Sequence, residues 1–315
     1  MNRSSIKRNI RLILFACFFL VIIFLITTCN RKKQPLLSAC LTTEEKVDLE
    51  YFFRLLMFEN HGVFVLFGSK PLCEMHLSDS ESKAADIAFQ QWFDSLPDDK
   101  RTAFKARMKN KTQEEPELER NPYRGWLAWE KVRKTFEMKR YILRIVPLRG
   151  PGRYGLMLVN IQQTSLIMAQ NYTIFKNAAR MEFNPFQIVF ELQNPDSIFW
   201  KNVFSIPNHL AKGLLFGFGL KNSILGDLRF TYSNTKVSSE LKKPIMKHLK
   251  RASPAVSTNQ VKYGDGSPSN FTIPLFSPIE GDDTAEKYEK EKIEIEKIYR
   301  GKDLVEVTLQ RLARF

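Results

Sequence analysis

Cysteine is the most reactive residue type in this chain, and its four copies divide between two environments. Cys17 and Cys29 belong to an apolar run near the N-terminus, whereas Cys40 and Cys73 lie in the more polar remainder, where only these two could pair. The sequence contains no Cys-x-x-Cys pair and no Cys/His cluster with metal-ligand spacing, so we expect no zinc site. A disulfide between Cys40 and Cys73 is therefore the first chemistry to consider.

The disulfide prediction depends on how the intervening chain folds. A helix over 43–58 climbs about 24 Å, and a strand over 62–68 returns about 23 Å in the opposite direction. Cys73 follows that strand, and Cys40 precedes the helix, so both fall at the same end of the unit. The geometry permits a bridge if the compartment is oxidising. The alternative is that Cys73 is a small buried strand residue and Cys40 a free thiol in a tether.

Two other motifs match catalytic patterns by letter only. Gly150, Gly152 and Gly155 have the spacing G-x-G-x-x-G, but a dinucleotide fingerprint follows a strand and opens a helix. Here the next residues have the pattern of a strand, which predicts a hairpin turn and no nucleotide cofactor. Ser4 and Lys7 match S-x-x-K but precede the apolar run, outside any folded site. We therefore expect no catalytic residue, cofactor or metal from these motifs.

The histidines and one glycine-rich segment are better explained by structure than by chemistry. We expect His61 at a helix end and His76 on a strand, each in a structural role. The segment GLLFGFG (213–219) has the small residues of close helix packing or of a membrane-dipping segment. Residues 209–220 are too few to span a bilayer, so we predict a core helix that ends at glycines.

The apolar run LILFACFFLVIIFLITT (12–28) contains no charge, proline or glycine. As a helix it would span about 26 Å, near the lower limit for a bilayer core. Arg11 precedes it and Arg31 is the first of three basic residues that follow it. We predict a single-pass transmembrane helix over 12–28 that contacts membrane lipid.

Two alternatives to an uncleaved anchor remain open. Ile26-Thr27-Thr28-Cys29 resembles a lipoprotein signal, which makes Cys29 a candidate lipidation site, although Thr28 departs from that pattern. A cleaved signal peptide requires small residues before the cut, and this segment matches poorly. Flanking positive charge slightly favours an N-terminus (1–11) in the cytoplasm. The body would then face the periplasm, with the chain held in the bacterial inner membrane.

Composition is ordinary for a globular body. Apolar residues make up 43% of the chain and charged residues 26%. The net charge of +14 falls to +7 when the first 33 residues are set aside, because those residues carry seven Lys and Arg and no acid. A mildly basic body is weak support for nucleic-acid binding, and we expect none. Neither the charge nor the composition identifies a small-molecule substrate.

Apolar periodicity predicts an α+β body that is rich in helices and has a small, mainly antiparallel sheet. Thr42 and Glu45 have the form of a capping box that starts the helix over 43–58, and Gly62 would supply the positive φ that ends it. Strands are expected over 63–68, 72–77, 141–147 and 154–160. Further helices are expected over 84–95, 97–109, 123–137, 163–180, 185–193 and 196–218.

The predicted domain organisation has the α+β body at 34–232, followed by a flexible linker at 233–282, which is rich in Ser, Pro, Asn, Gly and Lys. The last segment, 283–315, reads as a charged helix with Tyr288 and Ile295 on its apolar side, followed by a second apolar-patterned piece. No internal repeat is evident.

Two short segments carry a family resemblance. Phe67-Gly68-Ser69-Lys70-Pro71, after an apolar helix and strand, and GLLFGFG (213–219) with Asn222 resemble segments of membrane-anchored proteins of chlamydia-like intracellular bacteria. The resemblance covers residues 45–225 and implies an envelope protein, but it supplies no catalytic residue. We therefore expect a non-enzymatic interaction module; the alternative is an envelope enzyme whose active site the sequence does not reveal.

Overall fold

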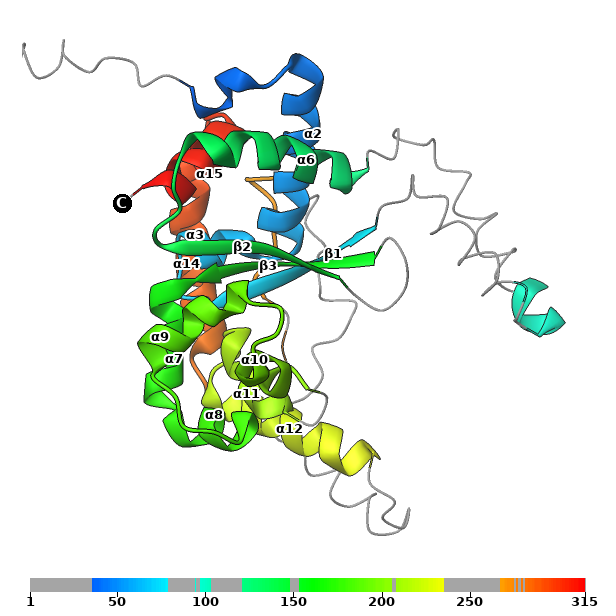
Figure 1. Cartoon of the computed structure of the whole chain (residues 1–315), viewed down its shortest axis with the longest axis vertical. Helices are drawn as coiled ribbons and strands as arrows, with labels where there is room; N and C mark the ends of the chain where they lie inside the picture. The colour runs from blue at the N-terminus through cyan, green and yellow to red at the C-terminus, as the bar shows by residue number, and fades with distance from the viewer. Residues whose placement is uncertain are drawn as a thin grey trace, which may run out of the picture.

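The computed structural model describes residues 36–78, 94, 97–102, 121–147, 153–205, 208–234, 267–274, 276, 279 and 281–314. This body is rich in helices and contains a small antiparallel sheet, which confirms the predicted α+β class (Figure 1). The run 12–28 and Cys29 lie outside the described residues, as do the predicted helix over 84–95, apart from Asp94, and most of the one over 97–109. Among the helices of the described ranges, none has the length and apolarity needed to cross a membrane.

The sheet has three strands in the order β1-β3-β2, so β3 is central. Its strands are β1 (Leu72–Ser78), β2 (Tyr141–Pro147) and β3 (Arg153–Asn160). Leu158 of β3 lies opposite Cys73 of β1 and Leu143 of β2, and both pairings are antiparallel. The strands on either side of the predicted hairpin turn are therefore confirmed, while residues 148–152 of the turn lie outside the described part.

The sheet separates two apolar cores, because successive side chains on a strand point to opposite faces. Met75 and Leu158 face the first core, and Ile142 and Val159 face the second. The first core is completed by α2 (Thr43–Arg54), α3 (Gly62–Leu66), α6 (Pro122–Val132), α14 (Thr284–Tyr299) and α15 (Leu304–Ala313). The second is completed by α7 (Ile161–Gln170), α8 (Tyr172–Ala179), α9 (Pro185–Ile188), α10 (Ile198–Val203) and α11 (His209–Leu215).

Shorter elements and one long helix complete the described body. They are the 3₁₀ helices η1 (Leu37–Cys40), η3 (Arg133–Thr135) and η4 (Val189–Gln193), the π-helical turn η2 (Leu55–Glu59) and the helix α12 (Leu220–Asn234). Several predicted helices are interrupted: the one over 163–180 is α7 and α8, which meet at Asn171. The one over 196–218 is α10 and α11.

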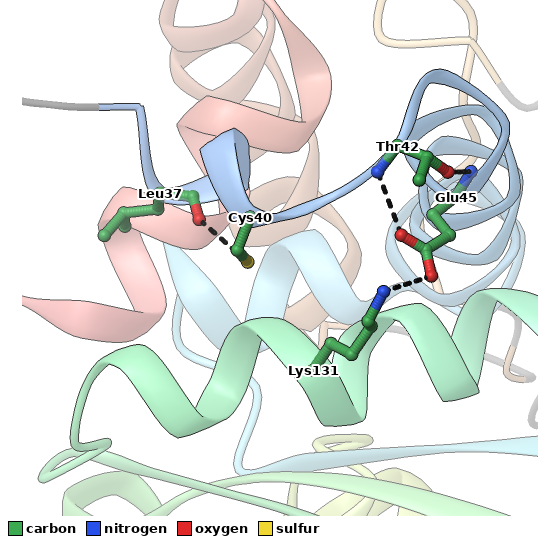
Figure 2. Close-up of polar contacts among 5 residues, drawn as sticks. All are labelled: Leu37, Cys40, Thr42, Glu45 and Lys131. Atoms are coloured by element: carbon green, nitrogen blue, oxygen red, sulfur yellow. Dashed lines mark hydrogen bonds and ion pairs between the residues drawn. The ribbon is translucent and has the colours of Figure 1, made fainter.

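The start of α2 is fixed by the predicted capping box (Figure 2). Thr42 Oγ1 accepts a hydrogen bond from the Glu45 amide at 3.2 Å, and the Glu45 carboxylate accepts one from the Thr42 amide at 2.9 Å. Lys131 of α6 also reaches this carboxylate, so the cap connects two packed helices. The sequence pattern alone identified this helix start correctly.

Replacing Thr42 with alanine should lower the free energy of unfolding by about 1 kcal/mol, because the Glu45 amide loses its partner. Urea denaturation followed by far-ultraviolet circular dichroism measures the change. Thr43→Ala is the matched control, since Thr43 is exposed and follows the cap. Equal losses in the two variants would contradict a stabilising role for the box.

The strand predicted over 63–68 is wrong: α3 covers Gly62–Leu66, and all five of its residues are buried. A short, wholly buried apolar run has no periodicity that distinguishes a strand from a helix. The positive φ predicted at Gly62 occurs instead at His61, at 62°. Gly62 is needed for space, because a Cβ there would lie 2.7 Å from the carbonyl oxygen of Leu56.

The disulfide predicted between Cys40 and Cys73 is not formed, and both cysteines are free. Cys40 is exposed on η1 (Figure 2), whereas Cys73 is buried on β1. The prediction relied on a strand that would bring the chain back to the start of α2. A five-residue helix such as α3 advances only about 8 Å, so that return does not occur. The second alternative, a buried strand residue and a free thiol, matches the structure.

The C-terminal segment belongs to the first core. Tyr288 and Ile295 of α14 are buried there, which confirms the apolar side predicted for this helix. Phe271, within the segment predicted as a linker, is also buried, with its ring centroid 5.3 Å from that of Phe58. This part of the segment predicted as a linker is therefore packed against the body at Phe271.

Candidate functional site

A cavity of about 230 Å³ lies beside β1, an edge strand of the sheet. It is bounded by the end of η2, the start of α3, the chain leading into β1, and the loop between α11 and α12. Its lining residues are Glu59, Asn60, His61, Lys70, Cys73, Glu74, Phe216, Phe218 and Pro274. Titratable side chains and aromatic rings thus share one small space, so this cavity is the candidate site.

Lys70 is the buried cation of this cavity, with only 4% of its surface exposed. Its Nζ donates a hydrogen bond to the carbonyl oxygen of Phe216 at 2.8 Å. The same nitrogen lies 5.9 Å from the ring centroid of Phe216 and 5.7 Å from that of Phe218. Within the described ranges, no carboxylate comes within ion-pair distance of it. A carbonyl and two ring faces are weaker partners for an ammonium than a carboxylate.

Burial lowers the pKa of Lys70 from its ordinary value of 10.5 to about 8, against a small opposing effect of the nearby Cys73. Desolvation has this direction for any base, because it penalises the charged form. Lys70 therefore loses its proton at a lower pH than an exposed lysine does.

The loop after α11 must approach Lys70 closely, and two glycines allow it. Gly217 and Gly219 have φ of 79° and 76°, which L-residues with side chains rarely adopt. A Cβ at Gly217 would collide with the hydroxyl of Tyr288, which donates a hydrogen bond to the Gly217 carbonyl at 2.8 Å. The predicted core helix ending at glycines is confirmed by α11, and its end forms one wall of the cavity.

Burial also shifts the pKa values of His61, Cys73 and Glu59, which line the same cavity. Burial, with the charge of Lys70, lowers the pKa of His61 to about 4, so its ring is neutral at pH 7. Burial raises the pKa of Cys73 to about 12, so its thiol keeps its proton and is a poor nucleophile. Burial also raises the pKa of the Glu59 carboxyl, against the charge of Arg54. Lys70 is thus the activated nucleophile of the set.

The structure brings together some of the residues that the sequence singled out and separates others. His61 and Cys73 line the cavity, whereas Cys40 does not, and Cys29 lies outside the described residues. The two segments that carry the family resemblance meet here, since a Cβ at Gly217 would lie 3.3 Å from both Lys70 Cγ and Pro71 Cδ.

Lys70 was not predicted from the sequence as a site residue. The available signal was a lysine within a largely apolar stretch, between Ser69 and Pro71. Glu59, Phe216 and Phe218 had no comparable signal, because they reach the cavity only through packing between distant segments.

No family model, curated protein or solved structure matches this chain. Among the residues that the structure describes, no group of three or more His, Cys, Asp or Glu side chains could hold a metal ion. The chemistry of the site is therefore inferred from the arrangement of its own side chains.

The free energy of unfolding should rise by about 2 kcal/mol between pH 7.5 and pH 10 because of Lys70. Its pKa is about 8 in the folded chain, below the ordinary 10.5 expected when unfolded. Between these values the unfolded chain binds more protons, so raising the pH favours folding. Urea denaturation of the wild type and of Lys70→Met at both pH values measures the effect, which the variant should lose.

The Cys73 thiol also contributes in this window: burial raises its pKa to about 12 in the folded chain, so the unfolded thiol loses its proton first and the free energy of unfolding falls. This opposing change is present in both proteins, so the effect of Lys70 is the difference between them. Burial raises the pKa of Tyr288, which lowers stability above pH 10 and sets the upper limit of the measurement. Lys201→Met, at an exposed lysine, is the matched control. The same pH dependence in the wild type and Lys70→Met would contradict the prediction.

Proposed function

We propose that the chain is a single-pass, membrane-anchored protein of the bacterial envelope whose body is a non-enzymatic binding module. The helix over 12–28 contacts membrane lipid, and the body faces the periplasm. The body binds a small ligand in the cavity around Lys70. The observation that carries the binding proposal is this buried amine, which lies against two aromatic rings and a backbone carbonyl.

Support for anchoring comes from the uninterrupted apolar run and its basic flanks. Described structure begins at Leu36, and η1 starts at Leu37, a short distance along the chain from Thr28. A folded body so near the run would lie close to the membrane surface. A lipid on Cys29 would hold the folded body at a similar distance from the membrane. The N-terminal residue of the mature protein distinguishes a lipid anchor from a transmembrane helix.

Support for binding comes from the size and lining of the cavity. Ligand pockets are concave, largely apolar, and contain a few polar groups that fix orientation. At about 230 Å³ this cavity is smaller than most drug-sized sites, which favours a ligand of a few heavy atoms. Phe216, Phe218 and Pro274 offer apolar walls, and Lys70 and Glu74 offer polar contacts.

An envelope enzyme is the second candidate, and one observation favours it. Glu59 and Lys70 share the cavity, and burial moves the pKa of the acid upwards and that of the base downwards. Perturbed acids and bases in one cleft are typical of catalytic sites. Once a ligand is found, an assay for its chemical conversion distinguishes an enzyme from a binding module.

The orientation of the body can be tested with its own cysteines. Cys40 is exposed and Cys73 is buried, so Cys40 reports which side of the membrane the body faces. A membrane-impermeant maleimide added to spheroplasts should label Cys40, and Cys40→Ser should remove that label. Labelling of Cys40 only after lysis would overturn the periplasmic assignment. Mass spectrometry of the mature N-terminus, with or without lipid on Cys29, identifies the anchor.

Ligand binding can be tested by thermal unfolding of the full chain in detergent. Millimolar propionate, whose size suits the cavity, should raise the unfolding temperature saturably, since a ligand that binds only the folded state stabilises it. Glu74→Trp places a large ring in the cavity and should abolish the shift, while Lys201→Met should retain it. The absence of a shift in the wild type, or an equal shift in Glu74→Trp, would contradict the binding proposal.

A further inference from the structure

We propose that Lys70 captures its ligand covalently, as an imine formed with a small aldehyde or ketone. This inference rests on the proposed function, because it names the ligand class of the same cavity. It uses three features of the described residues: an amine held in place, a carboxyl group at the rim, and a small space whose walls combine polar side chains with Phe216, Phe218 and Pro274.

The position of Lys70 Nζ is fixed by its surroundings. The Phe216 carbonyl accepts one of its protons, and the rings of Phe216 and Phe218 lie within 6 Å. When the amine is uncharged, its lone pair must point away from the proton donated to that carbonyl. Lys70 is one of the residues that line the cavity, and the proposal places the bound carbonyl group on that side of the nitrogen. The side chain is thus held ready for attack rather than free in solvent.

Imine formation requires the uncharged amine, and the surroundings of Lys70 favour it. An apolar, desolvated lysine loses its proton far more readily than an exposed one, which is how proteins activate amines toward carbonyl groups. In the described ranges no carboxylate pairs with Lys70 to hold its proton, and the nearby Cys73, which opposes deprotonation, has a smaller effect than burial.

The reaction balances without any oxidant or reductant. The lone pair of Lys70 Nζ forms a bond to the carbonyl carbon, and the carbonyl oxygen takes up a proton, giving a carbinolamine. The carbon–oxygen bond then breaks, and the oxygen leaves as water with a second proton, while nitrogen forms the double bond to carbon. Two amine protons and the carbonyl oxygen together make the released water.

Glu59 is placed to supply and accept these protons. It lines the same cavity from an exposed position, and partial burial raises the pKa of its carboxyl above the ordinary value. A carboxylic acid of this kind can protonate the departing oxygen and then recover a proton from nitrogen. Cys73 cannot compete for the carbonyl group, because its thiol remains protonated.

Reductive trapping of the full chain in detergent tests the proposal. We use propanal as the probe and sodium cyanoborohydride to reduce the imine to a stable propyl adduct, which peptide mass spectrometry locates. Lys70 should react at least about tenfold faster than the exposed lysines, because more of it is uncharged at pH 7.5. Lys201, Lys290 and Lys297 serve as internal controls in the same molecule.

Two variants and a pH series test the roles of individual groups. Lys70→Arg keeps the charge and the hydrogen-bond donors but cannot form the imine, so the adduct at this site should vanish. Glu59→Gln should slow the labelling of Lys70 several-fold and leave that of Lys201 unchanged. The labelling rate of Lys70 should level off above about pH 8, near its pKa. The labelling rate of exposed lysines should keep rising until the pH reaches their higher pKa. The comparison of Lys70 with the exposed lysines is made within the wild-type chain. It therefore tests the proposal even if a variant fails to fold.

The outcomes separate this inference from the proposed function. If Lys70 reacts no faster than Lys201 while propionate still raises the unfolding temperature, the cavity binds ligands without an imine, and the inference is overturned. If Lys70 reacts no faster than Lys201 and propionate does not raise the unfolding temperature, the proposed function fails as well. Preferential labelling of Lys70 that excess propionate suppresses would support both, because the two probes would share one cavity.

Discussion

Gly125→Ala is expected to lower the free energy of unfolding by about 3 kcal/mol, the result of overpacking a helix crossing. Gly125 lies on α6 where this helix crosses α2, and an added Cβ would collide with the carbonyl oxygen of Asp48 and the Cβ of Phe52. Neither atom is the end of a flexible side chain, so the two helices would have to separate. Their separation would also disturb the edge-to-face contact between Phe52 and Trp126, whose ring centroids lie 6.2 Å apart.

Urea denaturation monitored by circular dichroism measures this loss. Gly226→Ala is the matched control, because Gly226 lies within α12 and an added Cβ there meets no atom within 4 Å. Alanine favours a helix over glycine, so the control should be unchanged or more stable by up to about 1 kcal/mol. A loss below 1 kcal/mol in Gly125→Ala would mean that the crossing can relax, and would contradict the predicted close packing.

The elements that the sequence predicted correctly are those with a strong local signal. Thr42 and Glu45 mark a helix start by their types and spacing alone, and the structure contains both hydrogen bonds of the box. The strand over 72–77 was found because it follows the turn at Ser69-Lys70-Pro71, and those over 141–147 and 154–160 because they flank a glycine-rich turn. Local rules suffice where one element decides its own conformation.

Residues 63–68 show where local rules fail. All residues of α3 are buried, so no polar position reveals a helical or an extended period. The choice of a helix follows from the first core, where Phe64 contacts Phe271 and Tyr288 from distant parts of the chain. One wrong element then produced a second error, the predicted disulfide, because the distance that a segment spans depends on its conformation.

The candidate site could not be predicted from local sequence, because its parts are far apart in the chain. Lys70 reaches Phe216, which lies 146 residues away, and Tyr288 of α14 braces the loop that carries this contact. Each segment on its own has an ordinary explanation: a turn before a strand, and a helix that ends at glycines. Only their packing gives the lysine an apolar environment and makes it chemically distinct from the exposed lysines.

The N-terminal edge of the body depends on a similarly distant contact. Glu306 of α15 is only 7% exposed, and its carboxylate accepts hydrogen bonds from the amides of Leu37 at 3.2 Å and Ser38 at 3.0 Å. It also accepts one from the Ser38 hydroxyl. These three bonds attach η1, the described element nearest to the predicted membrane anchor, to the last helix of the chain. We therefore expect Glu306 to hold η1 against α15.

Glu306→Ala should lower the free energy of unfolding by about 3 kcal/mol, because two amides and a hydroxyl lose a shared partner in a buried place. Glu306→Gln, which keeps the shape and one oxygen, should lose about 1 kcal/mol. Urea denaturation measures both, and hydrogen exchange should show the amides of Leu37 and Ser38 losing protection. Glu286→Ala, at an exposed glutamate paired with Lys290, is the control and should be unchanged. If Glu306→Ala and Glu286→Ala are equally stable, η1 is held by its apolar contacts, and the carboxylate does not fix it.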